Sequence, residues 1–422
     1  MMDFKGKKIL ILAGASVHNK VVRTAKDMGL YVIVTDYLEP HLSPAKQLAD
    51  ESWMYSITEV DAIVDRCKQE RVDAVLNFCI DPAQKPYQQI CEKLGVPCYA
   101  TKEQFEIFTD KRLFKDFCIK HNVDVIPDYT EEDINNNLAE YPLFIKPSIC
   151  RGSRGQSICY TKDEALEGLE LAQSLSADGK CICEKYMGNN QDIASAFFVV
   201  NGEPYLVKFG DRYLGDSKDG LDKQVMCTKF PSDFTPTFEE RVMDRVKSMI
   251  KALGIKFGPV FLQGFVDGDT IRYYDPALRM PGGDYDLVLK HATGFDTVKS
   301  LIHYAVTGDT TFYYGNPVDC FKLNAGVGMI ICFSVREGKI AKVEGLDELL
   351  NNSKIIYGRQ IIPEGEYIQA CGDIRQRVAA VGAFVPTKQD AEIFVKQIYD
   401  TYHVYDENGE DMIVSKYEYK AN

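Results

Sequence analysis

The sequence lacks the closely spaced cysteine and histidine pairs that most zinc sites require. Its 13 cysteines are an odd number without a C-x-x-C pair, and its six histidines are dispersed. Cys181 and Cys183 lie two apart on a predicted strand, so their side chains share one face and are poorly placed to bridge each other. We therefore expect reduced, mostly buried thiols in a cytoplasmic protein, with neither a zinc site nor a histidine-based catalytic triad.

Long hydrophobic runs and an excess of positive charge are also missing. The apolar run near the start, Lys8–Ala13, is far shorter than the roughly 20 residues that span a bilayer, and no later run is long enough either. The sequence thus predicts no secretory leader and no membrane segment. The net charge of −13 argues against a nucleic-acid-binding surface over the whole chain. The expected partners are small molecules, not nucleic acid or a membrane.

What the sequence does contain, in its first hundred residues, is an alternation of strands and helical segments. Four short apolar runs are typical of buried strands, and a helical pattern lies near Val21–Met28. This alternation predicts a doubly wound parallel sheet, in a first domain of residues 1–100. The four predicted strands are Lys8–Ala13, Tyr31–Thr35, Val72–Phe78 and Val96–Ala100.

The turn after the first strand leaves a dinucleotide site as an alternative. Gly14 and Asp36 have the spacing of a strand, turn, helix and acidic strand end. However, the turn lacks the G-x-G-x-x-G pattern that lets backbone approach a pyrophosphate. The other interpretation is a crevice that borders a substrate pocket. His18 would then line that crevice, although a surface turn is the favoured place for it.

The rest of the 422-residue chain is long enough for further domains, two to four in all being the expectation. A small α+β unit, predicted to be a lid over about residues 115–185, is followed by a larger unit and by a final β-rich part with one helix. The lid elements are the strands Tyr141–Lys146, Gln156–Tyr160 and Lys180–Glu184 and the helix Asp163–Ser174. The later strands are Ala194–Val200, Pro204–Phe209, Val260–Val266, Thr270–Tyr274 and Gly326–Phe333, and the later helices are Phe238–Ala252 and Gln389–Tyr402.

The loop Ser148–Gln156 is the strongest local signal for a ligand. It holds two glycines, two serines and two arginines, directly after a strand that ends in Lys146. Glycines let backbone N–H groups turn toward phosphate oxygens, and the hydroxyl, guanidinium and ammonium groups add donors. The alternative is a plain hairpin turn with solvated arginines. The residues expected to bind phosphate are Lys146, Ser148, Arg151, Gly152, Ser153 and Gly155.

Two later segments add acidic and basic groups. Glu184 ends a strand that could offer backbone groups to an adenine edge, and Asp192 could accept from ribose hydroxyls. Gln263 and Asp275 lie on two predicted neighbouring strands, and oxygen ligands of this kind suit Mg²⁺. Arg279 could stabilise negative charge on a reacting group. The alternative is that Asp275 caps a turn and pairs with Arg279.

In this order, the pieces resemble the ATP-grasp superfamily, which includes biotin carboxylase, carbamoyl-phosphate synthetase and D-alanine–D-alanine ligase. The resemblance covers nearly the whole chain. It implies a Rossmann-like parallel-sheet domain at 1–100, an ATP-grasp domain at 101–315 with its lid, and a C-terminal α+β domain at 316–422. Members of comparable families are often dimers, so a homodimer is one expected state.

The resemblance also implies roles for individual residues. Lys111 and Lys146 match the two phosphate-binding lysines, and the loop through Gly155 matches the glycine-rich lid. The matches to the adenine hinge are Glu184, Lys185 and Met187, and Asp192 falls at the ribose contact. Asp275 falls at a magnesium carboxylate, and Arg279 matches the arginine beside the reacting acyl phosphate. Lys208, on a strand before the Asp275 region, could point toward phosphates, and a solvated face is the alternative for it.

Two positions depart from the family pattern. Gln263 stands where a metal-binding glutamate is common, and Ala277 stands where an asparagine is common. An amide supplies one neutral carbonyl ligand, and alanine supplies none. Two magnesium ions would therefore be held by fewer protein anions than usual.

The function that the resemblance implies is an ATP-dependent carboxylate–amine ligase. A small acid would attack the γ-phosphate of ATP to give an acyl phosphate and ADP, and an amine would then displace phosphate. Lys146 and Arg279 are the expected catalytic residues, with ATP and Mg²⁺ as cofactors. One alternative is an ATP-binding protein of this fold with weak or lost ligase activity, and the other is an NAD-dependent oxidoreductase.

Overall fold

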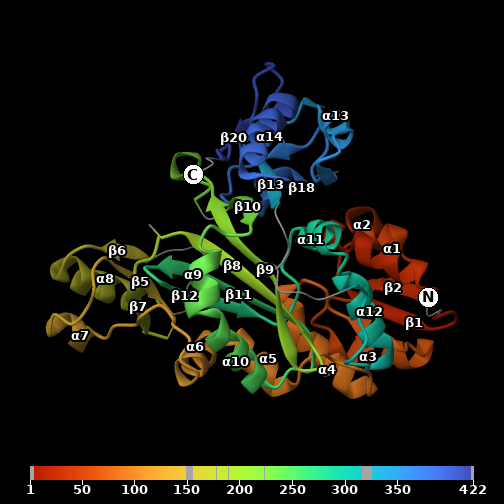
Figure 1. Cartoon of the computed structure of the whole chain (residues 1–422), viewed down its shortest axis with the longest axis horizontal. Helices are drawn as coiled ribbons and strands as arrows, with labels where there is room; N and C mark the ends of the chain where they lie inside the picture. Colours follow the sequence, from red (N-terminus) through yellow and green to blue (C-terminus); the bar gives the residue numbers. More distant parts are fainter. Residues whose placement is uncertain are drawn as a thin grey trace.

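The structure is a computed structural model, which describes residues 4–148, 155–176, 178–188, 190–222, 224–315 and 326–419. Figure 1 shows a long central sheet with the N-terminal part at one end, a small unit at the other, and the C-terminal part above. Within the described residues, no helix is both long and apolar enough to cross a membrane.

The N-terminal part contains the predicted parallel sheet. Its strands are β1 (Lys8–Leu12), β2 (Tyr31–Thr35), β3 (Glu51–Trp53) and β4 (Ala74–Leu76), in the order β3-β2-β1-β4. The strand predicted at Val96–Ala100 is wrong, because this segment is irregular and contains Pro97, which has no N–H to donate to a ladder. The helices here are α1 (Asn19–Asp27), α2 (Pro44–Leu48), α3 (Val60–Glu70), α4 (Gln84–Leu94) and α5 (Lys102–Thr109).

The small unit is a three-stranded antiparallel sheet with its own apolar core. Its strands are β5 (Leu143–Pro147), β6 (Ser157–Cys159) and β7 (Cys181–Lys185), in the order β6-β5-β7. The helices α7 (Glu131–Asn135) and α8 (Lys162–Leu175) cover it, and Ile134, Leu143, Ile145 and Leu169 fill the core. The preceding helix, α6 (Lys111–Lys120), packs instead on α5 and β12, so Phe114 and Cys118 belong to the main core.

A nine-stranded sheet forms the body of the molecule. Its main path is β12-β11-β8-β9-β10-β13-β18-β16, with β20 paired to β13. The pairing of β10 with β13 carries the sheet from the central part into the C-terminal part without a break. The strand bounds are β8 (Asp192–Val200), β9 (Glu203–Leu214), β10 (Val225–Phe230), β11 (Phe257–Asp267), β12 (Thr270–Ala277), β13 (Val327–Val335), β16 (Ile355–Gln360), β18 (Arg377–Val385) and β20 (Ile413–Val414).

Helices cover the sheet, and α9 and α10 lie across one face of its central strands (Figure 1). The single helix predicted at Phe238–Ala252 is two helices, which meet at Val242. Phe238 stacks on Phe209 of β9 with ring centroids 4.2 Å apart, which fixes α9 on the sheet. The remaining helices are α9 (Thr235–Arg241), α10 (Met243–Leu253), α11 (Tyr285–Thr293), α12 (Thr297–Thr307), α13 (Leu346–Leu350) and α14 (Lys388–Thr401). The short remaining strands are β14 (Gly338–Lys339), β15 (Lys342–Glu344), β17 (Tyr367–Ile368) and β19 (His403–Tyr405).

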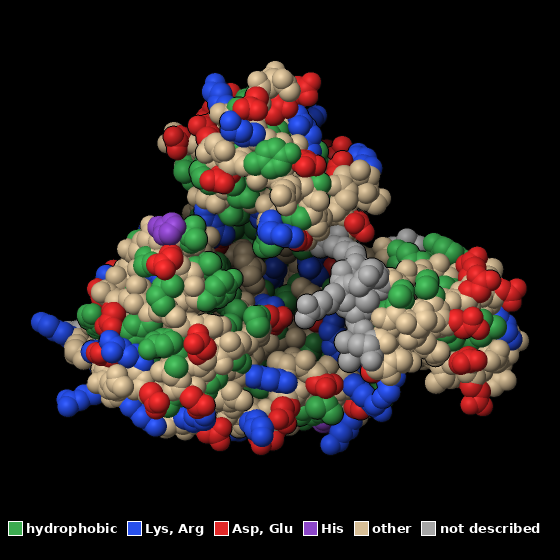
Figure 2. Space-filling model, turned by 180° about the vertical axis from the view of Figure 1, so that it is seen from behind, with side chains coloured by type: hydrophobic (Ala, Val, Ile, Leu, Met, Phe, Trp, Pro, Cys, Tyr) green, Lys and Arg blue, Asp and Glu red, His purple; other side chains and the backbone are tan. Residues whose placement is uncertain are grey.

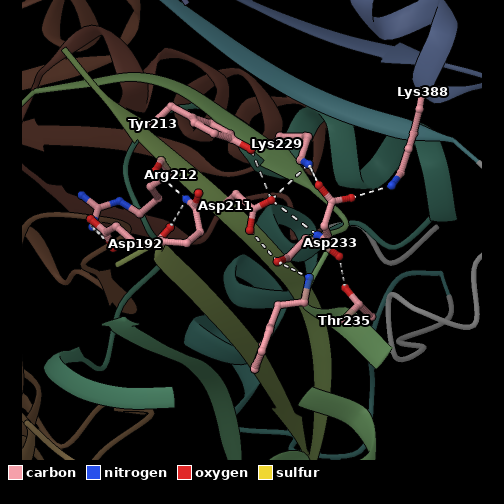
Figure 3. A network of polar contacts seen from close by, with 11 residues as sticks. Asp192, Asp211, Arg212, Tyr213, Lys229, Asp233, Thr235 and Lys388 are labelled. Atoms are coloured by element: carbon pink, nitrogen blue, oxygen red, sulfur yellow. Dashed lines mark hydrogen bonds and ion pairs between the residues drawn. The ribbon is translucent and has the colours of Figure 1, made fainter. Parts of the chain in front are cut away.

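Successive residues of β9 send their side chains to opposite faces of this sheet. Figure 3 shows Arg212 joined to Asp192 and, next to it, Asp211 in a separate network. In that network Lys229 lies 3.1 Å from Asp211 and also contacts Asp233, which accepts a hydrogen bond of 2.6 Å from Lys388 of α14. The Asp211 face therefore ties the C-terminal helix to the sheet.

Candidate active site

The floor of the candidate site is the pair of strands β11 and β12. Gln263 and Asp275 are direct partners in their antiparallel register, so both side chains lie on one face. Lys111 approaches this pair from α6, with its Nζ 3.4 Å from Asp275 Oδ1. Asp110 caps that helix by accepting hydrogen bonds from the backbone N–H groups of its first turn, which places Lys111 at the helix start. The predicted phosphate lysine and the predicted metal carboxylate thus meet.

The hinge between the small unit and the body holds one carboxylate between two lysines. Glu184 of β7 accepts from Lys146 of β5 at 2.9 Å and from Lys115 of α6 at 3.1 Å. Burial opposes the ionisation of Glu184, but the two ammonium groups outweigh it and lower its pKa. Lys115 was not among the predicted site residues. Its spacing of four from Lys111 is the signal that could have found it, because residues four apart share one face of a helix.

The next residues of the hinge point elsewhere. The side chain of Lys185 leaves on the opposite face of β7 and pairs with Glu140 at 3.0 Å and with Asp267. Its backbone N–H donates to the carbonyl of Pro127 at 3.0 Å. Met187 is buried. An adenine contact at Lys185 or Met187 would therefore use the remaining backbone groups.

Asp192, at the start of β8, is buried beside Arg212. Both of its oxygens accept from Arg212 Nη1, at 3.1 and 2.8 Å. Burial raises the pKa of Asp192 to about 6, although the guanidinium acts in the other direction. The carboxylate predicted to contact ribose is thus already engaged, although each oxygen keeps further capacity to accept a hydrogen bond.

Two further cations lie over aromatic rings. Lys208 is buried, with its Nζ 5.0 Å from the ring centre of Tyr285 and 5.6 Å from that of Phe230, so the solvated-face alternative for it is wrong. Arg279 lies over Phe261 and donates to Asp81 of the N-terminal part at 2.8 Å. The alternative pairing of Arg279 with Asp275 is therefore not what the structure has.

Three parts of the chain meet next to Arg279. Lys20 of α1 contacts both Asp284 and Asp286, and Arg359 of β16 lies 3.0 Å from the other oxygen of Asp284. Figure 2 shows a hollow where these parts come together, with lysine and arginine side chains along it. The site is therefore a junction of the N-terminal part, the central sheet and the C-terminal part.

Part of the sequence that forms this site matches a known protein family. Residues 110–200 match the family described as "Carbamoyl-phosphate synthase L chain, ATP binding domain". The described part of that segment includes Lys111, Lys146, Glu184 and Asp192.

Solved structures extend the similarity to nearly the whole chain. The phosphoribosylglycinamide synthetase of Anaerococcus prevotii is 17% identical, with a TM-score of 0.77 over 95% of this chain and 100% of that one. The L-amino acid ligase of Bacillus licheniformis is 16% identical, with a TM-score of 0.75 over 96% of this chain and 100% of that one. The biotin carboxylase domain of the Hydrogenobacter thermophilus 2-oxoglutarate carboxylase, solved with MgADP and bicarbonate, has a TM-score of 0.75 at 18% identity, over 94% of this chain and 90% of that one.

The chain has the ATP-grasp fold.

Curated relatives match a smaller part of the chain. A formate-dependent phosphoribosylglycinamide formyltransferase of Prochlorococcus marinus is 22% identical over 281 residues, which is 64% of this chain and 70% of that protein. In a second Prochlorococcus marinus protein of that name the match covers 44% of the length, and in the Hydrogenobacter thermophilus 2-oxoglutarate carboxylase small subunit it covers 48%. The chain thus spans about half the length of several curated relatives that it matches.

Only part of the ATP-grasp loop after β5 is described. Ser148 contacts the side chains of Ser176 and Asp178, at the far end of α8. Gly155 has a φ of +72°, and a Cβ there would lie 2.9 Å from Pro147, so glycine is required. Arg151, Gly152 and Ser153 lie outside the described residues.

The crevice beside Gly14 is closed by protein groups. Asp36 accepts from the Gly14 N–H at 2.9 Å and from the Ser43 hydroxyl at 2.7 Å, and buried Lys46 lies 3.3 Å from its other oxygen. Each oxygen of this carboxylate thus has two protein partners, since Oδ1 also accepts from the Leu38 N–H at 2.7 Å, which leaves no capacity for a dinucleotide ribose. The expectation of a surface place for His18 is wrong: the ring is fully buried, and this burial lowers its pKa to about 4.

The floor formed by β11 and β12 offers few charged ligands to Mg²⁺. Among the residues that the structure describes, no three histidine, cysteine or acidic side chains form a group that could hold a metal. Asp275 and Gln263 supply one charged and one neutral oxygen donor, side by side. This set fits a magnesium ion that takes its other ligands from phosphates and water, which is a common arrangement for this ion.

Proposed function

We propose that this chain is an ATP-dependent ligase that joins a small carboxylic acid to an amine, through an acyl phosphate, with release of ADP and phosphate. The proposal rests on the contacts made by two lysines on one face of α6. There, Lys111 contacts Asp275 on the floor, and Lys115, one turn later, contacts Glu184 at the hinge, next to Lys146. Three cations and two acids in this order form a cradle for a triphosphate with a metal at one end.

The roles of the residues follow from their places. Lys111 and Lys146 would neutralise phosphate oxygens, and Arg279 would stabilise the negative charge on the acyl phosphate and on the tetrahedral intermediate. Asp275 and Gln263 would hold Mg²⁺, which when bound supplies charge neutralisation at the phosphates. The small unit would close over the phosphates and exclude water, which otherwise hydrolyses an acyl phosphate.

The test is ADP release, measured with magnesium over a panel of small acids and amines. ADP release that requires both an acid and an amine is the expected result. Tight ATP binding without acid- or amine-dependent ADP release would overturn the proposal in favour of a nucleotide-binding protein with lost ligase activity. The neutral groups at Gln263 and Ala277 are the features that favour that second candidate.

The oxidoreductase alternative is separated by thermal shift. We expect ATP to stabilise the protein and NADH to leave its melting temperature unchanged, because Asp36 is engaged by Gly14, Ser43 and Lys46. Stabilisation by NADH and none by ATP would overturn the ligase proposal. The domain limits at 100 and 315, the lid limits at 115 and 185, a homodimer and a cytoplasmic location remain proposals that rest on the sequence.

A further inference from the structure

A β-bulge lies in the floor of the site. The register of β11 and β12 shifts between Gln263 and Gly264, which are opposite Asp275 and Tyr273, so Tyr274 is the extra residue. In a regular strand Tyr274 would face away from Asp275. A bulge re-aims the extra side chain, and here the Tyr274 hydroxyl reaches Gln263 Oε1 at 3.4 Å. Its ring stacks on Phe265 with centroids 5.0 Å apart, which restricts its movement.

The hydroxyl of Tyr274 is one member of a chain of hydrogen bonds. Arg212 Nη1 donates to it at 3.1 Å, and Arg212 is held in turn by Asp192 at 2.8 Å. Figure 3 shows Arg212 and Asp192 joined in this way. A guanidinium group can only donate, so the tyrosine oxygen accepts from Arg212. The proton of the hydroxyl is directed to Gln263 Oε1, and Asp192 is a neighbouring acceptor for it.

The direction of these bonds decides the orientation of the Gln263 amide. Because Tyr274 donates, the amide group must present its oxygen, and not its NH₂, to the hydroxyl. An amide oxygen has two lone pairs, so one remains for a cation beside Asp275. Without the hydroxyl, the amide could turn and present NH₂, which cannot bind a cation.

We propose that Tyr274 is a positioning residue that, held by Arg212 and Asp192, fixes the Gln263 oxygen toward Asp275 so that the pair binds a single divalent cation. The inference rests on the proposed function, since the phosphates of a bound nucleotide complete the site. Asp275 is the one carboxylate of this floor whose partner, Lys111, is exposed, because Asp192 is paired with a mostly buried Arg212 and Gln263 and Ala277 are neutral.

The test uses Mn²⁺ and ADP, with the full chain. Equilibrium dialysis gives the Mn²⁺ bound per bound ADP, and we expect one in the wild type. Tyr274→Phe should lower the Mn²⁺ affinity of the ADP complex about tenfold, as loss of an outer-shell partner does. The matched control is Tyr273→Phe, the same chemical change at the neighbouring residue, whose hydroxyl contacts Ser195 instead. It should leave the Mn²⁺ affinity unchanged.

A second variant separates positioning from a merely structural role. Gln263→Glu replaces the amide by a carboxylate, which presents an oxygen in either orientation. In that background, Tyr274→Phe should change Mn²⁺ affinity by less than about twofold. Two Mn²⁺ per ADP in the wild type would overturn the single-cation site. An unchanged Mn²⁺ affinity in Tyr274→Phe, or an equal loss in the Gln263→Glu background, would overturn the positioning role.

ADP binding in EDTA tells this inference apart from the proposed function. It should be the same in the wild type and in Tyr274→Phe, because the change concerns the metal alone. Absence of ADP binding in the wild type would overturn the proposed function, and this inference with it. Normal ADP binding combined with two Mn²⁺ per ADP, or with an unchanged Mn²⁺ affinity in Tyr274→Phe, would overturn the inference but not the proposed nucleotide site.

Discussion

Two acidic side chains in this molecule, Asp36 and Glu184, each lie beside lysine, and their surroundings differ. Asp36 and Lys46 are both buried in the N-terminal part, and Lys46 also donates to the backbone carbonyls of Asp36 and Leu38. Glu184 and Lys146 are partly exposed, and Glu184 is shared with Lys115. In the first set, Asp36 and Lys46 make their contacts within the protein interior, whereas in the second the lysines beside Glu184 keep their ammonium groups at a surface where a ligand could reach them.

The difference separates stabilisation from binding. A buried ion pair whose hydrogen bonds are all made within the protein has nothing left to offer a ligand, and breaking it leaves an uncompensated charge. A carboxylate between two partly exposed lysines can give up one of them to a phosphate at little cost. Variants of the first set should therefore alter unfolding, and variants of the second should alter nucleotide affinity.

The largest effect is expected for Lys46→Met. The change leaves Asp36 buried beside an apolar side chain, so the free energy of unfolding should fall by roughly 3 kcal/mol. Urea denaturation measures it. Lys26→Met is the matched control, because Lys26 pairs with Asp50 at 2.8 Å on the surface, and it should cost about 0.5 kcal/mol. Equal losses in the two variants would mean that burial does not distinguish these pairs.

Next in size is the effect of Lys146→Met on ATP binding. The loss of one charge-assisted contact to phosphate should weaken ATP about tenfold to a hundredfold, while the free energy of unfolding changes little. Isothermal titration calorimetry measures the affinity. The control is Lys162→Met, on α8 of the same small unit, where Lys162 donates to the carbonyl of Asn135. An unchanged ATP affinity in Lys146→Met would remove Lys146 from the phosphate site.

The third effect concerns stability again and appears as a pH dependence caused by His18. Burial lowers its folded-state pKa to about 4 from 6.5, so the unfolded chain binds the proton more tightly in this window. The stability that neutral His18 contributes is present above pH 6.5 and is lost as the pH falls toward 4. The wild type should lose about 2 kcal/mol more than His18→Gln between pH 7.5 and pH 5.

Urea denaturation of both proteins at the two pH values gives the result, and the readout is the difference between the pH values rather than the stability itself. A parallel pH dependence in the wild type and in His18→Gln would show that the imidazole titrates normally in the folded chain.

Individual strands could be predicted from the sequence because their signals are local, whereas the ATP-grasp fold was implied by a resemblance in the order of motifs. The apolar run Lys8–Ala13 and the run at Gly326–Phe333 each have the composition of a buried strand, and each is one. Lys111 and Asp275 could be placed by the order of motifs along the chain, and the structure brings them to 3.4 Å.

The rest could not be predicted, because it depends on tertiary contacts. Nothing local marks Tyr274 as a bulge residue, since the shift arises from how β12 pairs with β11. The partner of Arg279 is Asp81, almost two hundred residues earlier in the chain. The burial of His18 follows from the parts that close over the first turn, and a turn sequence alone favours an exposed histidine.

Because the chain is synthesised from its N-terminus, Lys20, Asp284 and Arg359 become available for their junction at different times. The N-terminal part and the segment that carries Asp284 leave the ribosome before β16 does, so Asp284 and Lys20 can pair while the third charge is still missing. Arg359 then completes the junction. A chain truncated before residue 355 would still contain Lys111, Lys146 and the strands of the floor, but its junction at Asp284 would stay open on one side.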